Sequence, residues 1–400
     1  MNTTVITQED GLEKIKEHSA KIGEPSWVLD QRLSAARAMP SYGEPVFKYG
    51  IDIFLPVDEF DFSTIVPTNS LQDRFCVEKE GYTLLDFWSA FERYPGLMRE
   101  HLPFPIEDKF LALHGALWNK GTLLYLKKGS NVLLPIYYDS FVEYTNQFDT
   151  LLVVAEEGAS AVIVNKVAGG SPNPVFRSGV VRIVAKEGAQ LTFVGLQQLS
   201  GGTVNFSNHS CQIGKDASVV FVDALIGSNY SKSDTSHHLL GEGARTHHIG
   251  IFLGDGKQRF NISSAAFHHK PFTTSEIYGK GALYGKAKSL YRGLVRIEKN
   301  AENSNGYQKE ETLLLGDNTE ASAIPNLEIH NNNVRCSHGA STTHVDQEKL
   351  FYLASRGIAE KDALSLLVNG FFTSIISKIG VEEISSELQQ IMEEKIAHAT

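Results

Sequence analysis

The stretch LLVVAEEGASAVIV, residues 151–164, joins two runs of alternating apolar residues through a tight turn at Glu157-Gly158. Four further segments in the middle of the chain have the same form, and aligned positions follow one another at spacings of 29, 30, 28 and 27 residues. A near-constant period of this length indicates a repeated structural unit. The other segments are LLYLKKGSNVLL (123–134), VRIVAKEGAQLTFV (181–194), SCQIGKDASVVFV (210–222) and HHLLGEGARTHHIGIF (237–252), aligned at Ser130, Ala159, Ala189, Ala217 and Ala244.

Each unit is expected to form two strands joined at a Gly or Asp, where the backbone needs a positive φ or a local side-chain hydrogen bond. One unit cannot bury its apolar face alone, whereas stacked units share an interior and pair each strand with the units above and below. The pattern therefore favours a mostly β protein with a β-solenoid core. A β-sandwich is the alternative, because regular strands with turn signals are also typical of that class. After Ala244 the spacing becomes irregular, which predicts a continued solenoid with insertions.

Helical spacing marks both ends of the chain. It covers Glu9 to Ala38 and a second stretch near Leu84 to Met98. From Asp346 onward the sequence predicts three helices, with Asp346 as N-cap and Gly357 as the stop of the first. Wide apolar stripes on the second and third indicate a cover for the last solenoid coil, a surface for a partner, or both. We expect a helical domain over residues 1–105, a β-helix core over 106–345 and a C-terminal helical domain over 346–400.

The composition argues against a nucleic-acid or membrane protein. The 400 residues include 37 Lys and Arg against 47 Asp and Glu, for a formal net charge of −10. No basic cluster is present to neutralise phosphates, and polar residues interrupt the most apolar segment, residues 363–379. The first residues lack the apolar core of a secretory signal, so we expect a cytoplasmic protein. A reducing compartment also fits the three isolated cysteines, which are Cys76, Cys211 and Cys336.

The glycine-rich segment GKGALYGKAKS, from Gly279, does not satisfy the spacing of a phosphate-binding loop. Gly279 and Gly285 are six residues apart where the motif needs five, and Lys286 is followed by Ala287 rather than a hydroxyl residue. We therefore expect that this chain binds no nucleotide.

Three adjacent histidine pairs occur between residues 237 and 269. Neighbouring residues on a strand point to opposite faces, so one pair cannot present both rings to a single metal ion. Rings from different rungs can meet, but no second type of ligand is spaced with them. Ordinary surface or stacked histidines are therefore the favoured interpretation. The pairs are His237-His238, His247-His248 and His268-His269.

The segment NLEIHNNNVRCSHGAS, residues 326–341, concentrates metal-binding residue types. Cys336 and His338 are two apart, which places both side chains on one face of a strand, and Glu328 and His330 precede them. Thiolate, imidazole and carboxylate are ligands of iron and zinc. The alternative is a buried cysteine beside a hydrogen-bonded histidine.

Five ordered motifs in the C-terminal third, together with an N-terminal one, resemble the SufB/SufD family of iron–sulfur cluster assembly proteins. The resemblance implies a right-handed parallel β-helix flanked by helical segments. The motifs are YRGLV (291–295), LLLGD (313–317), IPNLEI (324–329), VRCSHGAS (334–341), LFYLASRGI (350–358) with the ALSLLVNGFF helix after it, and EPSWVLDQRLSAARAM (24–39).

Within that family the chain looks closer to SufD. SufB proteins carry a cysteine where this chain has Ile329, and a Glu-His-Glu triplet where it has Ser337-His338-Gly339. The CSHGA context of His338 resembles the SufD pattern. Without a thiol at position 329, the resemblance implies that this chain is not the primary sulfur acceptor.

The resemblance implies a non-catalytic scaffold of the SufBC2D type, paired with a SufB-like chain through the β-helices and docked to a SufC-like ATPase through the C-terminal helices. A homodimeric scaffold and a β-helix carbohydrate-active enzyme are the alternatives, although the rungs offer few paired carboxylates. A transient iron–sulfur cluster or iron would be held by His338, with Cys336 beside it. The candidate partner-binding residues are Phe351, Tyr352, Arg356, Leu367, Phe371 and Ile375.

Overall fold

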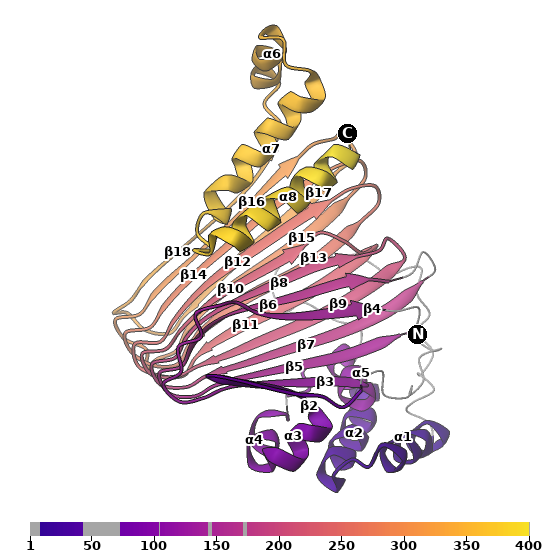
Figure 1. Ribbon diagram of the computed structural model, residues 1–400. Coiled ribbons are helices and arrows are strands. Elements are labelled where there is room, and N and C mark those ends of the chain that lie inside the picture. Colours follow the sequence, from indigo (N-terminus) through magenta and orange to yellow (C-terminus); the bar gives the residue numbers. More distant parts are fainter. Residues whose placement is uncertain (1–8, 43–72, 104, 143–145, 171–173, 400) are drawn as a thin grey trace.

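The computed structural model describes residues 9–42, 73–103, 105–142, 146–170 and 174–399, and shows a parallel β-solenoid of about 8 turns, with helical segments before and after it in the chain (Figure 1). Two sheets form the solenoid, and from β3 onward successive strands alternate between them. Sheet A has the order β1-β2-β3-β5-β7-β9-β11-β13-β15-β17, and sheet B the order β18-β16-β14-β12-β10-β8-β6-β4. Every pairing is parallel except β1 with β2 and β2 with β3. The solenoid interpretation is thereby confirmed, and the sandwich is excluded.

The strands of sheet A are β1 Cys76–Lys79, β2 Tyr82–Asp86, β3 Lys120–Leu126, β5 Gln147–Ala155, β7 Val175–Ala185, β9 Thr203–Ile213, β11 Tyr230–Leu239, β13 Arg259–His268, β15 Lys288–Ile297 and β17 Glu320–Ile329. Those of sheet B are β4 Ile136–Val142, β6 Ser160–Gly169, β8 Gln190–Leu199, β10 Ser218–Leu225, β12 Arg245–Gly254, β14 Thr274–Leu283, β16 Asn305–Leu314 and β18 Arg335–His344.

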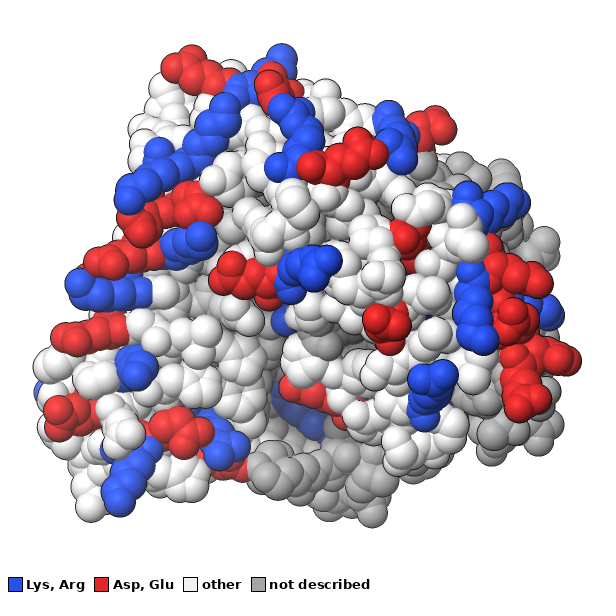
Figure 2. Space-filling model, turned by 90° about the horizontal axis from the view of Figure 1, so that it is seen from below, with Lys and Arg blue, Asp and Glu red and all other residues white. Residues whose placement is uncertain are grey.

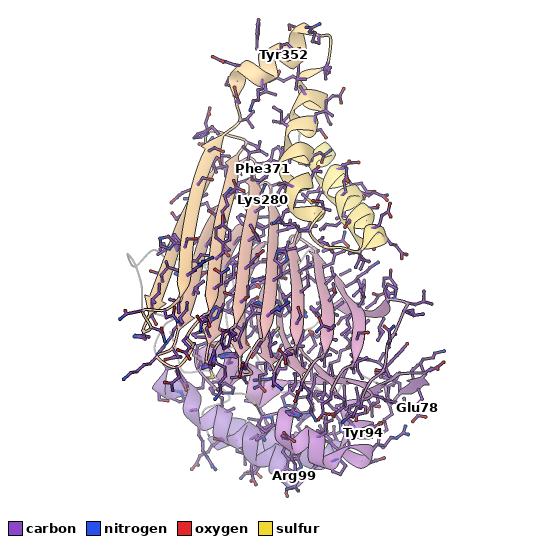
Figure 3. All side chains as sticks on the ribbon, turned by 90° about the vertical axis from the view of Figure 1, so that its left-hand side faces the viewer. Glu78, Tyr94, Arg99, Lys280, Tyr352 and Phe371 are labelled. Carbon is purple, nitrogen blue, oxygen red and sulfur yellow. The ribbon has the colours of Figure 1, made fainter. Side chains whose placement is uncertain are left out.

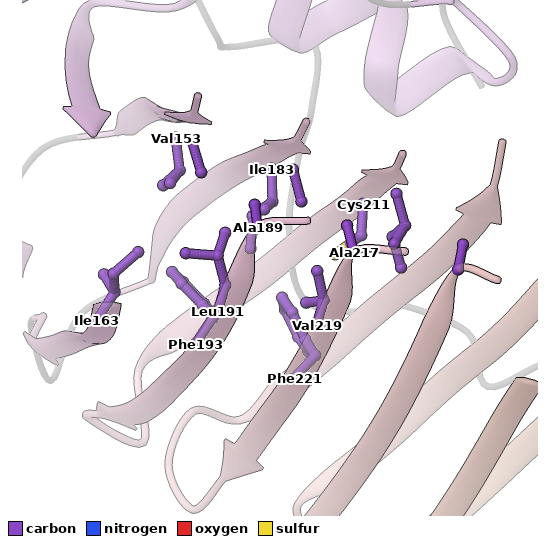
Figure 4. Packing of buried hydrophobic residues seen from close by; sticks show 14 of the residues in the cluster. Val153, Ile163, Ile183, Ala189, Leu191, Phe193, Cys211, Ala217, Val219 and Phe221 are labelled. Atoms are coloured by element: carbon purple, nitrogen blue, oxygen red, sulfur yellow. The ribbon is translucent and has the colours of Figure 1, made fainter. Parts of the chain in front are cut away.

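The repeated turn is the corner where each rung passes from sheet A to sheet B. Gly158 and Gly188 have φ values of 67° and 68°, which explains the glycine in the sequence repeat. The alanine that follows is fully buried at Ala159, Ala189 and Ala217. Inward side chains of both sheets pack between these corners, and Figure 4 shows the layers that they form. The period of the sequence therefore corresponds to one rung with a small residue at its corner.

The N-terminal helices pack on the first strands of sheet A (Figure 1). The helical expectation for residues 84–98 is wrong at its start, because Leu84 to Asp86 belong to β2, and Tyr94 separates two short helices. Two adjacent leucines, Leu84 and Leu85, fit the end of a strand as well as the start of a helix. These elements are α1 Glu9–Ile22, α2 Ser26–Ala38, the 3₁₀ helix η2 Met39–Ser41, α3 Phe87–Arg93, α4 Pro95–His101 and α5 Lys109–Leu117.

The three C-terminal helices are confirmed as α6 Gln347–Ser355, α7 Glu360–Ile376 and α8 Glu382–Ala399. The Asp346 carboxylate accepts hydrogen bonds from the amides of Glu348 and Lys349, and Gly357 has a φ of 83°. The apolar stripes of α7 and α8 pack on outward side chains of sheet B, while α6 projects away from the solenoid (Figure 1). They lie along the flank of the solenoid, so the expectation that these stripes cover the last coil is wrong.

None of the described helices is both long and apolar enough to cross a bilayer. On the face shown in Figure 2, basic and acidic side chains are interleaved and no single-sign patch stands out. That face offers no basic stripe of the kind that follows a phosphate backbone.

Candidate functional site

The C-terminal end of the solenoid is open. Among the described strands, β17 pairs only with β15, and β18 pairs only with β16. Leu327 on β17 is half-buried, whereas Val295, its partner in register on β15, is fully buried. Side chains that face the interior elsewhere in the solenoid therefore reach solvent at this end. We define the open end as the inward-facing residues of β16 and β18 together with the free edges of β17 and β18.

The free edge of β18 carries unused backbone donors. Arg335 and Val345 donate their amides to carbonyls of the preceding rung, to Ser304 and Leu314 respectively. In a parallel ladder alternate residues bond to opposite sides, so the amides at even positions from 336 to 344 point to the free edge. On β17 the corresponding edge contains Pro325, which has no amide to donate. The edge of β18 is therefore the better template for an added strand.

Cys336 and His338 occupy the inward face of β18, as the two-residue spacing predicted. Cys336 lies opposite Gly306, where an added Cβ would come within 3.2 Å of its sulfur, and His338 lies opposite Gln308. The thiol is half-buried against the interior, and burial raises its pKa to about 11. His338 is exposed. The pair thus combines an accessible imidazole with a thiol that is protonated at neutral pH unless a metal ion displaces the proton.

Glu328 and His330 do not join this pair. Glu328 lies on the opposite face of β17 from Leu327, and its carboxylate is 3.6 Å from Nε of Arg296. His330 is exposed just after β17. No cluster of three or more His, Cys, Asp or Glu residues suited to a metal ion occurs within the described residues. The set of four candidate ligand residues expected from the sequence is therefore reduced to Cys336 and His338.

Two polar residues on β16, the strand that pairs with β18 below Cys336 and His338, were not identified from the sequence. Gln308 and Glu310 face inward on β16, each 3% exposed, and each keeps one buried oxygen, Oε1 and Oε2 respectively, without a hydrogen-bond partner. Burial raises the pKa of Glu310 to about 7, although Thr312 donates a hydrogen bond to its other oxygen. In the sequence, Gln308, Glu310 and Thr312 alternate along β16, and this alternation was the only sign that they share one face. Without the structure, a polar face of this kind looks like the solvent-exposed side of a strand.

Polar residues are also buried in earlier rungs of the solenoid. Asp223 accepts a hydrogen bond from Ser233 Oγ at 2.7 Å and lies 3.8 Å from Nδ1 of His209. Nearby, the rings of His237 and His248 are 5.1 Å apart, and three of their four ring nitrogens are buried without a partner. Burial lowers the pKa of His237 to about 3, so this ring is neutral at physiological pH.

The histidine pairs divide between the two faces as strand alternation requires. His237, His248 and His268 are buried, whereas their sequence neighbours are half-buried. Inside the solenoid, the rings of His237 and His248 meet within one rung, from opposite sheets. Outside it, the rings of His238 and His269 meet across successive rungs. The interpretation as stacked and surface histidines agrees with this placement.

The six candidate partner-binding residues fall into two groups. Phe351 and Tyr352 on α6 are 77% and 57% exposed, and the Arg356 guanidinium lies 5.2 Å from the Tyr352 ring centroid. The other three lie on α7 and pack against sheet B within this chain: Ile375 is buried, and Leu367 and Phe371 are half-buried. Figure 3 shows Tyr352 on the projecting arm and Phe371 beside Lys280. Only the α6 group is freely exposed in this conformation.

Replacing Glu310 by Gln should change how stability depends on pH. A folded-state pKa of about 7 exceeds the ordinary value of 4.5, so the folded chain holds this proton more tightly than the unfolded chain. The stabilisation is complete below pH 4.5 and is lost as the pH rises through 7. Relative to Glu310→Gln, the wild-type free energy of unfolding should fall by roughly 3 kcal/mol between pH 4.5 and 7.5. Urea unfolding at a series of pH values measures this difference. If the free energies of unfolding of the wild type and of Glu310→Gln change in parallel with pH, the pKa of Glu310 is not raised in the folded chain.

Comparison with known proteins finds a family model and several relatives that match this chain. Residues 139–371 match the family model described as SUF system FeS cluster assembly, SufBD core domain. The iron–sulfur cluster assembly protein SufB of Bacillus subtilis (strain 168) is 27% identical over 439 residues, covering 95% of this chain and 92% of the relative. An iron–sulfur cluster assembly SufBD family protein of Staphylococcus epidermidis (strain ATCC 12228) is 29% identical over 316 residues, covering 76% and 67%. A SufBD family protein of Staphylococcus haemolyticus is 26% identical over 437 residues, covering 95% and 92%.

Proposed function

Because this chain belongs to the SufBD family of iron–sulfur cluster assembly proteins, we propose that it is a SufD-like scaffold that pairs with a SufB-like chain and docks a SufC-like ATPase. The open end of the solenoid is the observation that carries the proposal. It combines an unpaired strand edge, an accessible imidazole and a thiol in one place. The proposed scaffold has no catalytic role, and ATP hydrolysis belongs to the partner.

The pairing surface is the free edge of β18. A strand of the SufB-like chain that adds to this edge satisfies the amides of even-numbered residues and closes the polar interior. The same residues carry the inward side chains, so strand addition brings His338 and Cys336 against the partner. A second copy of this chain offers the same edge, and a homodimeric scaffold is therefore the other candidate.

The cluster is the cargo of this site, and His338 is its proposed ligand on this side of the interface. Ile329, at the SufB cysteine position, cannot supply a thiolate, so sulfur would arrive through the partner. An imidazole is a weaker cluster ligand than a thiolate, and this suits release to a recipient protein. Cys336 would bind only after losing its proton to the solvent or the partner, because its thiol pKa is raised.

The C-terminal arm is the proposed attachment point of the ATPase. Phe351 and Tyr352 expose aromatic surface on α6, and such anchors are typical of binding hot spots. Behind them, Nζ of Lys280 on β14 donates to the Phe371 carbonyl at 2.7 Å and to Ser374 Oγ at 2.8 Å. Since α7 is thus bonded to sheet B, a pull on α6 would reach the solenoid and, along it, the open end.

Co-purification with a SufB-like chain tests the pairing. Thr342→Pro removes an amide at the free edge of β18 without removing a bond to β16, so it should abolish association and leave the chain folded. Ala323→Pro on the free edge of β17 is the matched control and should leave association intact. If the Thr342→Pro chain associates normally, the assignment of this edge is wrong. If the wild-type chain remains a homodimer when the SufB-like chain is in excess, the homodimeric scaffold is favoured instead.

A further inference from the structure

His238 and His269 form an unusual pair on the outer face of sheet A. His238 is on β11, and His269 follows β13, the next strand of the sheet. Nδ1 of His238 and Nε2 of His269 are 3.4 Å apart, and the two ring planes differ by only 17°. Both side chains are half-buried, so each ring is partly fixed by packing and still reaches solvent.

The separation of the two nitrogens is more suited to a shared metal ion than to a direct bond. Hydrogen bonds between nitrogen donors and their acceptors usually measure about 2.9–3.0 Å, and 3.4 Å is long by that standard. Two imidazole nitrogens bound to one tetrahedral zinc ion at about 2.0–2.1 Å stand about 3.3–3.4 Å apart. The observed distance already matches that spacing before any side chain moves.

Neighbouring groups hold the pair in a state that can bind a cation. The Phe267 ring stacks on His238 with centroids 4.8 Å apart and planes 7° apart, which fixes the orientation of the imidazole. Burial, with the charges of His269 and Arg182, lowers the pKa of His238 to about 4, and burial also lowers that of His269. Both rings are therefore neutral at pH 7, with a lone pair available on each.

Local charge does not forbid a cation. Arg296 is engaged by Glu298, with Nε 2.9 Å from its carboxylate. The Glu298 charge favours positive charge at His269 and acts on it more strongly than Arg296 or Lys270, which oppose it. At His238 the opposing charge is that of Arg182. Imidazole is a common ligand of zinc, copper, nickel and iron.

We propose that His238 and His269 form a two-imidazole site for one divalent transition-metal ion, with solvent completing the coordination sphere. This site lies on the outer face of sheet A, whereas Cys336 and His338 face the interior of the solenoid. It is independent of the proposed cluster site and does not require a partner chain.

Titration of the full-length chain with Co²⁺ and Zn²⁺ tests the site. The background is Cys336→Ser with His338→Ala, which removes the proposed cluster ligands. Calorimetry should show one ion per chain at pH 7.5, and Co²⁺ should develop visible absorption bands. His238→Gln or His269→Gln should each weaken binding by at least about tenfold, since even an outer-shell partner of a ligand is typically worth that much in metal affinity.

The matched control is His247→Gln, which removes a half-buried histidine beside Tyr278 on the other sheet. It should bind the ion as tightly as its parent. A thermal shift by Zn²⁺ provides a second readout, and only chains with both rings should gain stability. The proposal would be overturned if the parent and the His238→Gln, His269→Gln double variant bound the metal ion with equal affinity. It would also be overturned if His247→Gln lost as much affinity as the single variants of the site.

Discussion

Replacing His338 by Ala should lower the rate of cluster assembly by the complete complex by at least about tenfold, since an outer-shell partner alone is typically worth that much in metal affinity. The side chain is exposed, so its removal should change the stability of the folded chain by less than about 0.5 kcal/mol. Complex formation and ATP hydrolysis should persist. Iron and acid-labile sulfide, measured over time in the reconstituted complex, report the effect.

His344→Ala is the matched control, because His344 is also exposed and lies on the same face of β18, six residues further along. This variant should assemble clusters at the wild-type rate. His338→Cys should restore part of the activity, since a thiolate is itself an iron ligand. If His338→Ala assembles clusters at the normal rate, His338 is an ordinary surface histidine and not a cluster ligand. The proposal that the chain is a scaffold would not be affected.

Replacing Phe351 by Asp should abolish co-purification of the ATPase. The side chain is 77% exposed on α6, so the substitution removes an apolar anchor and places a charge at the proposed contact without creating a cavity. The thermal unfolding midpoint should stay unchanged. Pull-down of the ATPase by the tagged chain is the measurement.

Phe272→Asp is the control for this experiment. Phe272 is 53% exposed at a corner of the solenoid, and the same change of side chain there should leave the ATPase bound. Phe371→Asp is a less selective test, because Phe371 packs against sheet B and its ring lies 4.3 Å from Nζ of Lys280. Retention of the ATPase by Phe351→Asp would show that α6 is not the docking element.

The solenoid could be predicted because its repeat is local. Each rung needs a residue with positive φ at the corner and a small residue after it, and both recur at one period in the sequence. The helix boundary at Asp346 and Gly357 was equally local. The start of α3 was misplaced because Leu84 and Leu85 fit a strand and a helix equally well.

The faces of the elements could not be predicted in the same way. An apolar stripe on α7 shows that the helix covers something, but not whether sheet B or a partner is covered, and Ile375 proved to be buried within the chain. For Glu310 the difficulty was the opposite one, because a polar residue proved to be buried. A carboxylate at an inward position looks like a solvent-facing residue until the rung around it is known. The pairing of His238 with His269 depends on the rung register, which the irregular spacing after Ala244 obscured.

Nitrogen hyperfine spectroscopy on the reduced cluster would test the central claim most directly. The complex is assembled from this chain carrying ¹⁵N-labelled histidine and an unlabelled SufB-like chain. We predict a ¹⁵N coupling of directly bound imidazole in the wild-type complex and its loss in His338→Ala. A cluster that forms in the complex with no coupling to the labelled chain would contradict it.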